Sequence, residues 1–362
     1  FRNELEAQVS EIFRKVLGFD RVGIHDDFFE LGGDSLLAMQ MVNRLRRNLK
    51  VNISVRNFFE ARTVANLAAF TRQCQHQSKA GETSSVPLIE ARSTGEQYPL
   101  SVAEQGIWFL WKLTPENPYY IARGIVTVRG DLNVSAFKAS WRALLERHDI
   151  LRVRFGEKDG APFQTFQDQS NFDLVMTDLS YLSPEEGYAA IHLKAEEEAT
   201  HPFNLQQESP LRPKLFRLSP QEHALLLVMH EIIVDIWSIR VLLRDLLKLY
   251  KGFVTEGRPS LSPLKLNFSN YIHWERQNIV SHGLPAQAAY WKSELSGELP
   301  VMNLPFDRPR RKSPRYTIQT ESVYLDAGLT RGIKALARQE KVTLFVTLLA
   351  AFDLLLQAYS GQ

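Results

Sequence analysis

The sequence is poor in the features that would assign it to several common classes of protein. It contains a single cysteine, Cys74, which excludes a disulfide framework within the chain and is typical of the reducing cytoplasm. No apolar run approaches the roughly 20 residues that a membrane-spanning helix needs, and no signal peptide is recognisable. The 43 basic and 41 acidic residues nearly cancel. The net charge therefore gives no reason to expect a nucleic acid or a membrane as partner, and we expect a cytoplasmic protein.

Motifs for several kinds of catalysis are also absent. The sequence has no glycine-rich phosphate loop, no nucleophile elbow and no cluster of cysteine and histidine with metal-site spacing. His230-Glu231 is not a zinc-protease motif, because Val234 stands where the second histidine would be. The sequence therefore predicts no metal site.

The composition changes twice along the 362 residues, which by length suggest two or three domains. Residues 1–73 carry helical patterns of apolar residues that predict a small four-helix bundle. Residues 74–97 are polar with little periodicity, which predicts a flexible linker. Residues 98–362 alternate between strand and helix patterns, which predicts a larger α/β domain.

In the first domain the patterns predict helices over residues 3–18, 35–49 and 63–70, with a short turn around Phe58. The helix over 35–49 presents one apolar face, formed by Ala38, Met41, Val42, Leu45 and Leu49. Leu36 falls on the opposite face. An exposed leucine there suggests a docking surface, although single exposed leucines are common.

In the larger domain, strands are expected over residues 121–128, 150–155, 163–166, 215–218, 224–230 and 317–325. Helices are expected over residues 105–113, 133–148, 184–200, 238–250, 271–279, 286–295, 330–339 and 344–359. The strand over 224–230 is almost continuously apolar, so it is expected at the centre of a sheet. Ser238 is expected to cap the helix that follows it.

Two glycines and an aspartate precede the helix that begins at Ser35. Gly32 and Gly33 allow a sharp turn, and Asp34 is a good N-cap. The free N–H groups and the dipole of a helix N-terminus favour an anion, so a phosphate on Ser35 would be well placed. The alternative is that Ser35 is only a residue of the first helical turn.

The run Asp-Asp-Phe-Phe-Glu-Leu-Gly-Gly-Asp-Ser-Leu at residues 26–36 resembles the attachment motif of carrier (thiolation) domains of nonribosomal peptide synthetases and hybrid polyketide synthases. The resemblance covers about residues 2–72. It implies that Ser35 carries 4′-phosphopantetheine, attached by a phosphopantetheinyl transferase, and that the thiol of this arm holds an acyl or peptidyl thioester. It also implies upstream adenylation or polyketide synthase domains as partners.

Residues 98–362 resemble the condensation domain of nonribosomal peptide synthetases, within the chloramphenicol acetyltransferase-like superfamily. The segments that carry the resemblance are Leu100–Leu110, Arg147–Phe155, Tyr271–Trp274, Leu304–Arg310 and Thr343–Gln362. The family has two lobes with the active site in a tunnel between them. The resemblance implies that this chain holds the N-terminal lobe and the start of the second. We therefore expect an excised piece of a longer protein that is inactive alone.

The active-site pattern of the family is His-His-x-x-x-Asp-Gly. It maps onto His230, Glu231 and Asp235, and Ile236 replaces the glycine. In the family the second histidine is linked to catalysis, where it orients or deprotonates the attacking amine. The first histidine and the aspartate are mostly structural. Arg212 is a candidate ion-pair partner for the aspartate or, equally, a surface charge.

Glutamate at position 231 leaves three interpretations open. Histidine has an ordinary pKa of about 6.5, which suits proton transfer near neutrality, whereas an exposed glutamate, near about 4.3, is a weak base. Burial would raise the pKa of the carboxyl. Glu231 is therefore a retuned base, a mark of a disabled site, or a deliberate substitution.

The sequence thus supports two functions of different classes. In the first, an acyl or peptidyl donor on the Ser35 arm enters the condensation domain, and an amine on a downstream carrier attacks it to form an amide. In the second, the condensation domain is non-catalytic and serves as a scaffold or gate that docks the carrier. A hybrid context, in which the donor is a polyketide acyl group, is a third and weaker interpretation.

Overall fold

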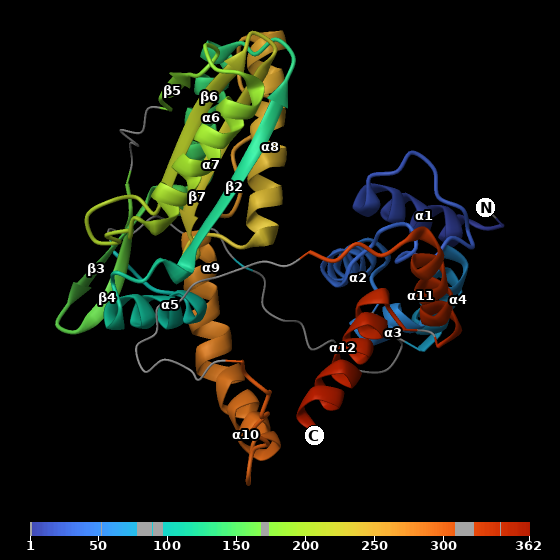
Figure 1. The fold of residues 1–362 in the computed structure, drawn as a ribbon. Helices are drawn as coiled ribbons and strands as arrows, with labels where there is room; N and C mark the ends of the chain where they lie inside the picture. The colour runs from blue at the N-terminus through green and yellow to red at the C-terminus, as the bar shows by residue number, and fades with distance from the viewer. Residues whose placement is uncertain are drawn as a thin grey trace. The chain divides into compact units, whose positions relative to one another are not determined.

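A computed structural model of the chain describes residues 2–51, 53–77, 89, 97–167, 174–307, 322–340 and 342–362. The backbone divides into two compact units, which are drawn in Figure 1. The first consists of residues 1–86, 301–309 and 320–362, and the second of residues 87–300 and 310–319. Most of the predicted linker, at residues 78–88 and 90–96, lies outside the described residues.

The N-terminal part of the first unit contains the expected helices, named α1 (Glu4–Leu17), α2 (Ser35–Leu49), α3 (Val55–Glu60) and α4 (Val64–Gln77). Local side chains fix where they begin: Asn3 accepts a hydrogen bond from the Glu6 N–H at the start of α1, and Ser54 caps α3. The four-helix plan is confirmed. Helix α4 continues past the predicted end at Phe70 and through the first four residues of the predicted linker.

The core of these four helices is built on packed phenylalanine rings. Phe13, Phe28 and Phe58 are fully buried, and the ring centroids of Phe28 lie 5.4 Å from Phe13 and 4.9 Å from Phe58, both edge to face. Helix α2 adds its predicted apolar face, of which four residues are buried: Ala38, Met41, Val42 and Leu45. Leu49, the fifth, is only partly buried. The loop before α2 is thus joined to the core through Phe28.

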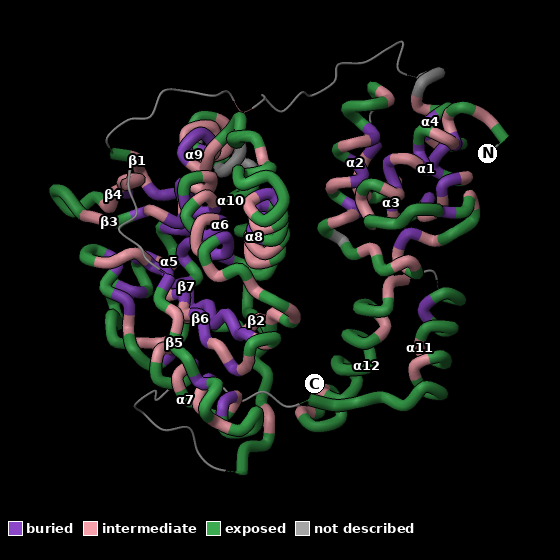
Figure 2. Tube along the Cα trace, turned by 90° about the horizontal axis from the view of Figure 1, so that it is seen from above, coloured by how far each residue is buried: buried purple, intermediate pink, exposed green. Residues whose placement is uncertain are grey.

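The first unit also contains α11 (Ala327–Gln339) and α12 (Leu344–Ser360), which confirm the last two predicted helices. Figure 2 shows them largely exposed, and none of the residues of α12 is buried. In the described part of the chain no single helix is long and apolar enough to cross a membrane. The bent pair formed by α11 and α12 meets that requirement by length and composition only.

The strand predicted over residues 317–325 is not formed where the chain is described. Residues 317–321 lie outside the described part, and residues 322–326 have no regular structure. Val323 and Tyr324 are exposed, and no described strand pairs with them. A β-branched and aromatic sequence forms a strand only where a neighbouring backbone completes its hydrogen bonds.

The second unit is built on a four-stranded sheet in the order β2–β7–β6–β5. The strands are β2 (Ile121–Arg129), β5 (Met176–Asp178), β6 (Leu211–Ser219) and β7 (Glu222–His230). Strand β7 pairs antiparallel with β2 and with β6, whereas β5 and β6 are parallel. Every residue of β7 after Glu222 is buried, which confirms the predicted central strand.

Helices cover both faces of this sheet. Figure 2 shows the strands between α6 (Val134–Arg147) and α8 (Ile236–Glu256) on one side and α7 (Pro184–Thr200) on the other. Leu227 and Met229 of β7 meet Trp141 of α6 and Leu246 of α8 around one apolar gap. Alternation along the strand puts Leu226 and its alternate neighbours on the opposite face. The end of β7 is therefore held from both sides.

A second, three-stranded sheet has the order β1–β4–β3, formed by β1 (Tyr98–Pro99), β3 (Val153–Lys158) and β4 (Ala161–Phe166). The strand predicted over residues 150–155 begins only at Val153. A 3₁₀ turn, Asp149–Arg152, replaces its first part, and the Asp149 carboxylate accepts a hydrogen bond from the Ile150 N–H in that turn. A short polar side chain that binds a nearby backbone N–H favours a turn over a strand.

The remaining helices of the second unit are α5 (Val102–Leu113), a short 3₁₀ helix (Pro118–Tyr120), α9 (Phe268–Glu275), a π-helical segment (Arg276–Gly283) and α10 (Leu284–Glu294). Helix α5 begins three residues before its predicted start because Ser101 and Glu104 form a capping box.

Asp245 of α8 is a buried carboxylate that binds three cations or potential cations. It accepts hydrogen bonds from Arg147 Nε at 2.9 Å and from Arg244, and it lies 3.1 Å from His148 Nε2. Burial acts to raise the pKa of Asp245, but the hydrogen bonds from Arg147 and Arg244 hold it below its usual range. Asp149, which follows His148 in the chain, accepts hydrogen bonds from the N–H groups of Phe268 and Ser269 at the start of α9. Residues 147–149 therefore tie α8 and α9 to α6.

Asp245→Asn is expected to destabilise the second unit by about 3 kcal/mol, because it leaves the half-buried Arg147 guanidinium without its counter-charge. All six tryptophans of the sequence lie between residues 108 and 291, so urea denaturation followed by tryptophan fluorescence reports on this unit. Asp131→Asn is the control, since Asp131 is exposed and accepts a hydrogen bond from the Gln221 amide. Equal losses in the two variants would contradict the assigned role of Asp245.

Candidate functional site

The predicted attachment residue, Ser35, is the first residue of α2. Its two chain neighbours, Asp34 and Leu36, are both exposed, so an enzyme can reach the backbone at this point. Leu36 is 39% exposed and Met39, one turn later, is 48% exposed. Ser35 thus lies at an accessible helix start beside two exposed apolar side chains.

The two glycines before Ser35 are needed for different reasons. Gly32 has a φ of +91°, in the left-handed region that favours glycine. Gly33 lacks space for a side chain, since a Cβ there would lie 2.3 Å from the Phe28 ring and 2.5 Å from the Phe28 carbonyl oxygen. The Gly33 N–H donates to that same oxygen at 2.9 Å. The turn is therefore held tightly against the buried core of the helical unit.

The first N–H groups of α2 are not free to bind an anion, contrary to the expectation from the sequence. The Asp34 carboxylate already accepts from the N–H groups of Leu36 and Leu37, at 3.0 and 2.8 Å. Asp34 is thus the predicted N-cap, and its charge takes the place that a phosphate would have had. A phosphodiester at Ser35 fits by its accessibility at the helix start, not by capture in a backbone cradle.

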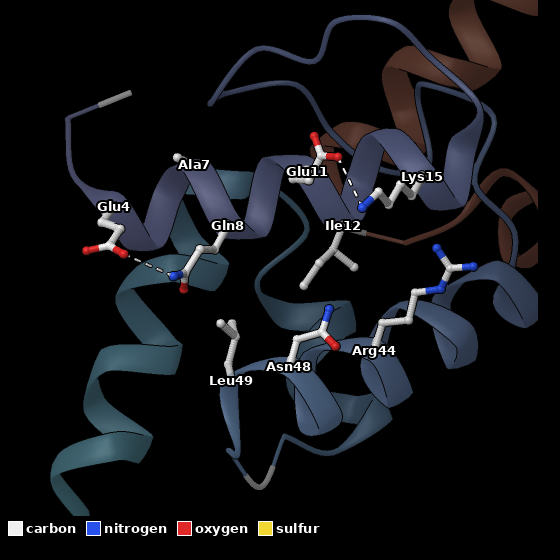
Figure 3. A pocket seen from close by; sticks show the side chains of 9 residues that line it. All are labelled: Glu4, Ala7, Gln8, Glu11, Ile12, Lys15, Arg44, Asn48 and Leu49. Atoms are coloured by element: carbon white, nitrogen blue, oxygen red, sulfur yellow. Dashed lines mark hydrogen bonds and ion pairs between the residues drawn. The ribbon is translucent and has the colours of Figure 1, made fainter.

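A groove of about 650 Å³ lies between α1 and α2, but it is not at the Ser35 end of the helix (Figure 3). It is lined from α2 by Arg44, Asn48 and Leu49, which are 9 to 14 residues beyond Ser35. At about 1.5 Å per residue, that separation is roughly 13 to 21 Å along the helix. Figure 3 shows Lys15 paired with Glu11 on its α1 side. The groove is therefore separate from the attachment residue.

The second predicted site lies where β7 ends and α8 begins. His230, the last residue of β7, is 2% exposed, and burial lowers its pKa to about 4. Its Nδ1 accepts a hydrogen bond from the Ile232 N–H at 3.1 Å, so the ring is neutral with its proton on Nε2. The ring packs beside Tyr120 and Phe203, with centroids 6.3 and 6.0 Å away. These contacts favour a structural role for His230.

Glu231 differs sharply from its neighbour in burial. Its backbone N–H donates to the Tyr120 carbonyl at 2.7 Å, but its side chain is exposed. The buried surroundings that a retuned glutamate base requires are therefore not found around this side chain. The fixed backbone holds the residue at the predicted catalytic position, beyond the end of the central strand.

Asp235 is the N-cap of α8, and the prediction that Ser238 caps this helix is wrong. The Asp235 carboxylate accepts from the Ser238 N–H at 2.7 Å and from the Ser238 hydroxyl at 2.6 Å. Aspartate and serine are comparable N-caps, and here Oδ1 of Asp235 accepts both hydrogen bonds, which makes Asp235 the cap and Ser238 the third residue of the helix. Asp235 therefore sets where the helix begins after the site.

Arg212 is not an ion-pair partner of Asp235 in the structure, so that suggestion is also corrected. Its guanidinium binds Glu208 at 3.0 Å and the carbonyl oxygens of His201 and Pro202. It also lies 3.8 Å from the centre of the Phe203 ring, which in turn contacts His230. Arg212 thus supports the wall of the site through Phe203, a role that sequence spacing could not show.

No group of three or more histidine, cysteine, aspartate or glutamate side chains is placed to hold a metal ion within the described residues. The site at the end of β7 contains a buried neutral histidine, an exposed carboxylate and a capped helix start. Such an arrangement can position a substrate and keep the protein backbone around the site rigid.

Comparison with known proteins assigns a family to each of the two domains of the chain. Residues 94–362 match the family described as "Condensation domain". The chain belongs to the condensation domain family. Residues 7–71 match the family described as "Phosphopantetheine attachment site". The chain therefore consists of a phosphopantetheine-bearing carrier domain followed by a condensation domain, as predicted from its two motifs.

Relatives of known function extend this match over the full chain. One of the subunits of the linear gramicidin synthase of Brevibacillus parabrevis is 37% identical over 361 residues, which are 100% of this chain and 7% of that protein. Tyrocidine synthase 3 of the same organism is 32% identical over 363 residues, again 100% of this chain and 5% of the relative. The carrier–condensation pair is of the nonribosomal peptide synthetase type and spans under a tenth of these relatives.

Solved structures show the same fold. The X-domain from teicoplanin biosynthesis is 28% identical, with a TM-score of 0.65 over 75% of this chain and 60% of that chain. A four-domain nonribosomal peptide synthetase, holo-AB3403, has a TM-score of 0.62 at 21% identity and covers 75% of this chain and 20% of that chain. The predicted fold class, a helical carrier domain before a condensation-type α/β domain, is confirmed.

Proposed function

We propose that Ser35 carries the phosphopantetheine arm and presents an acyl or peptidyl donor to the condensation domain, where an amine on a downstream carrier attacks it. The observation that carries this proposal is the position of Ser35, at the accessible start of α2 inside the matched phosphopantetheine attachment region. When attached, the arm supplies a thiol that holds the donor as a thioester. The order of the two domains in one chain supports delivery from the carrier to the condensation domain.

The covalent link between the domains favours the donor role. Two groups on one chain meet at a high effective concentration, without any new contact between them. Holding two reactants in the correct geometry can itself supply much of a rate enhancement. The condensation domain would then contribute chiefly by positioning, with His230 and Asp235 keeping the end of β7 and the start of α8 in place.

The partners follow from this role. A phosphopantetheinyl transferase attaches the arm, upstream adenylation or polyketide synthase domains load it, and a downstream aminoacyl carrier supplies the amine. We further propose that residues 1–73 form the carrier, 74–97 the linker, and 98–362 the N-terminal lobe and the start of the second lobe. The test of turnover uses the parent protein, which contains both lobes of the condensation domain.

Glu231→His in the two-lobed parent tests the reaction. With Ser35 loaded with a model acyl group and an aminoacyl carrier supplied, amide product is followed by mass spectrometry. Histidine at this position is expected to raise the rate by about 10²-fold, since it adds a general base near neutrality. Amide formed with Glu231 unchanged supports catalysis by positioning. No amide with Glu231 unchanged would overturn the catalytic proposal.

Glu185→His is the matched control, because Glu185 is an exposed glutamate in the first turn of α7. It tests whether any added surface histidine accelerates the reaction. The rate with Glu185→His is expected to equal that of the unchanged protein.

A second function, a non-catalytic domain that docks or gates the loaded carrier, is favoured by the exposed Glu231 in place of the family histidine. The neighbour from teicoplanin biosynthesis has been captured as a complex of the X-domain with OxyB, at 27% identity and a TM-score of 0.64 over 75% of this chain and 59% of that chain. A condensation-type fold that binds a protein is therefore a precedent for a scaffold. Amide formation only with Glu231→His would support this function.

A further inference from the structure

A buried carboxyl group at the start of α5 has an oxygen without a partner. Glu104 is 2% exposed, and its Oε2 accepts hydrogen bonds from the Ser101 N–H and from Gln164 Nε2, both at 2.7 Å. Its Oε1 is buried and has no hydrogen-bond partner. The Oε1 of Gln164, on β4, is also buried without a partner. Two unpaired acceptor oxygens therefore belong to the same carboxyl–amide pair.

One proton on Glu104 would satisfy this arrangement. A buried acceptor without a partner costs free energy, and an ionised carboxyl makes that cost larger. A protonated carboxyl is both a donor and an acceptor, whereas a carboxylate only accepts. The Gln164 amide already donates to one oxygen of Glu104, and its own carbonyl oxygen can accept from a protonated carboxyl. Acid and amide are then complementary.

A second buried carboxyl stands close by and makes a charge on Glu104 still less favourable. Glu275 of α9 is 6% exposed, and its two oxygens accept from the Val102 N–H and the Tyr271 hydroxyl, both at 2.9 Å. Burial raises the pKa of Tyr271 to about 12, so this hydroxyl keeps its proton. Two neighbouring buried carboxyls do not both ionise readily. Both oxygens of Glu275 accept hydrogen bonds, whereas Oε1 of Glu104 has no partner, so a proton on Glu104 would supply the hydrogen bond that is missing.

The charged and polar groups around Glu104 come from four elements. Helix α5 supplies the Ser101 cap, β4 supplies Gln164, and α9 supplies Glu275 and Tyr271. Arg276, which follows α9, donates to the Leu100 carbonyl at 3.4 Å. Burial is the main cause that raises the pKa of Glu104, to about 7, and the charge of Glu275 acts in the same direction. The hydrogen bonds from Ser101 and Gln164 oppose this rise.

We propose that Glu104 is held as a neutral carboxylic acid that fastens α5 to β4 through Gln164, and that loss of its proton loosens this end of α5. The proton leaves to solvent, and the resulting carboxylate faces Glu275. Helix α5 also reaches the site at the end of β7. The Nε1 of Trp111 donates to the Phe203 carbonyl at 3.0 Å, and the Phe203 ring packs on His230. The hydrogen-bonded pair of Glu104 and Gln164 thus fixes a helix that supports the wall of the site at the end of β7.

The chain contains a matched exposed position. Glu186 holds the same place in the capping box of α7 as Glu104 holds in that of α5, with Ser183 as its cap. Glu186 is exposed, and the hydrogen bond from the Ser183 N–H lowers its pKa. Glu186→Gln therefore makes the same exchange of carboxyl for amide as Glu104→Gln, but at an exposed capping position where no buried proton is lost.

Urea denaturation of the full chain between about pH 5 and about pH 8, followed by tryptophan fluorescence, tests the proposal. In the folded protein Glu104 keeps a proton that the same carboxyl has lost in the unfolded chain. Rising pH therefore favours unfolding until the pH passes the pKa of Glu104 in the folded protein. The unfolding equilibrium constant of the unchanged protein is expected to rise tenfold to roughly a hundredfold relative to that of Glu104→Gln over this range. The ratio of the unfolding equilibrium constant of the unchanged protein to that of Glu186→Gln should stay constant over the same pH range.

A pH profile of the unchanged protein that runs parallel to that of Glu104→Gln would overturn the proposal. Infrared spectroscopy of the unchanged protein, labelled with ¹³C on glutamate carboxyls, gives a reading that does not depend on the variant folding. A neutral glutamate carbonyl band that persists at about pH 6 and disappears by about pH 8 is expected. The absence of such a band at the lower pH would equally refute it.

Discussion

Ser35→Ala is expected to abolish the gain in mass that a phosphopantetheinyl transferase and coenzyme A give to this chain. Alanine removes the hydroxyl to which a phosphodiester would be attached, and no neighbouring hydroxyl replaces it, since Asp34 and Leu36 flank this position. The effect is therefore complete, not partial. Intact-mass spectrometry measures it directly.

The fold of the variant must be shown to be unchanged. The Asp34 cap binds backbone N–H groups of Leu36 and Leu37, so α2 keeps its start when the side chain at position 35 is shortened. Far-ultraviolet circular dichroism should match that of the unchanged protein. Ser54→Ala is a second control, which loses the cap of α3 at about 1 kcal/mol but should still accept the arm. An arm found on Ser35→Ala would contradict the assignment.

Gly33→Ala is expected to destabilise the carrier domain by about 3 kcal/mol, which is a large share of the stability of so small a domain. The added methyl group would lie 2.3 Å from a ring carbon of Phe28. That ring cannot move aside, because it is fully buried and packed edge to face on Phe13 and Phe58. Hydrogen exchange of peptides from α1 and α2 in the full chain should show the loss.

Gly32→Ala separates crowding from backbone strain. A Cβ at Gly32 has no heavy atom within 4 Å, so alanine there suffers only from the φ of +91°. Its cost is expected to be about 1 kcal/mol, clearly smaller than that of Gly33→Ala. The two adjacent glycines should therefore differ in their tolerance of alanine. A larger loss from Gly32→Ala would show that Phe28 does not limit this turn.

The elements that the sequence predicted best are those determined by local patterns. Helix α2 formed between the predicted residues because its apolar face repeats at helical spacing and Asp34 caps it. Strand β7 is central, as its unbroken apolar run indicated. Both patterns can be read within a window shorter than 20 residues. The motif at residues 26–36 identified the carrier domain for the same reason, whereas the condensation domain was identified from several short segments spread over residues 98–362.

The errors of prediction concern partners that are far apart in sequence or compete for one role. Arg147 meets Asp245 across 98 positions, and Asp149 binds the start of α9 across 119 positions. No periodicity reveals such pairs. Asp235 and Ser238 both have the chemistry of a helix cap, and only the geometry decides between them. The spacing Asp-x-x-Ser was the available signal, since an N-cap binds the third residue of its helix.

The contrast in burial between His230 and Glu231 has a consequence for which of the two positions can be substituted during evolution. The Glu231 backbone is fixed by Tyr120, whereas its side chain meets solvent, so replacing that side chain should scarcely alter folding. His230 is buried, and most replacements there would disturb the wall of the site. Adjacent positions 230 and 231 should therefore differ in their tolerance of substitution, low at the buried residue and high at the exposed one. Replacing the one side chain at position 231 can therefore add or remove a reactive group while the domain keeps its fold.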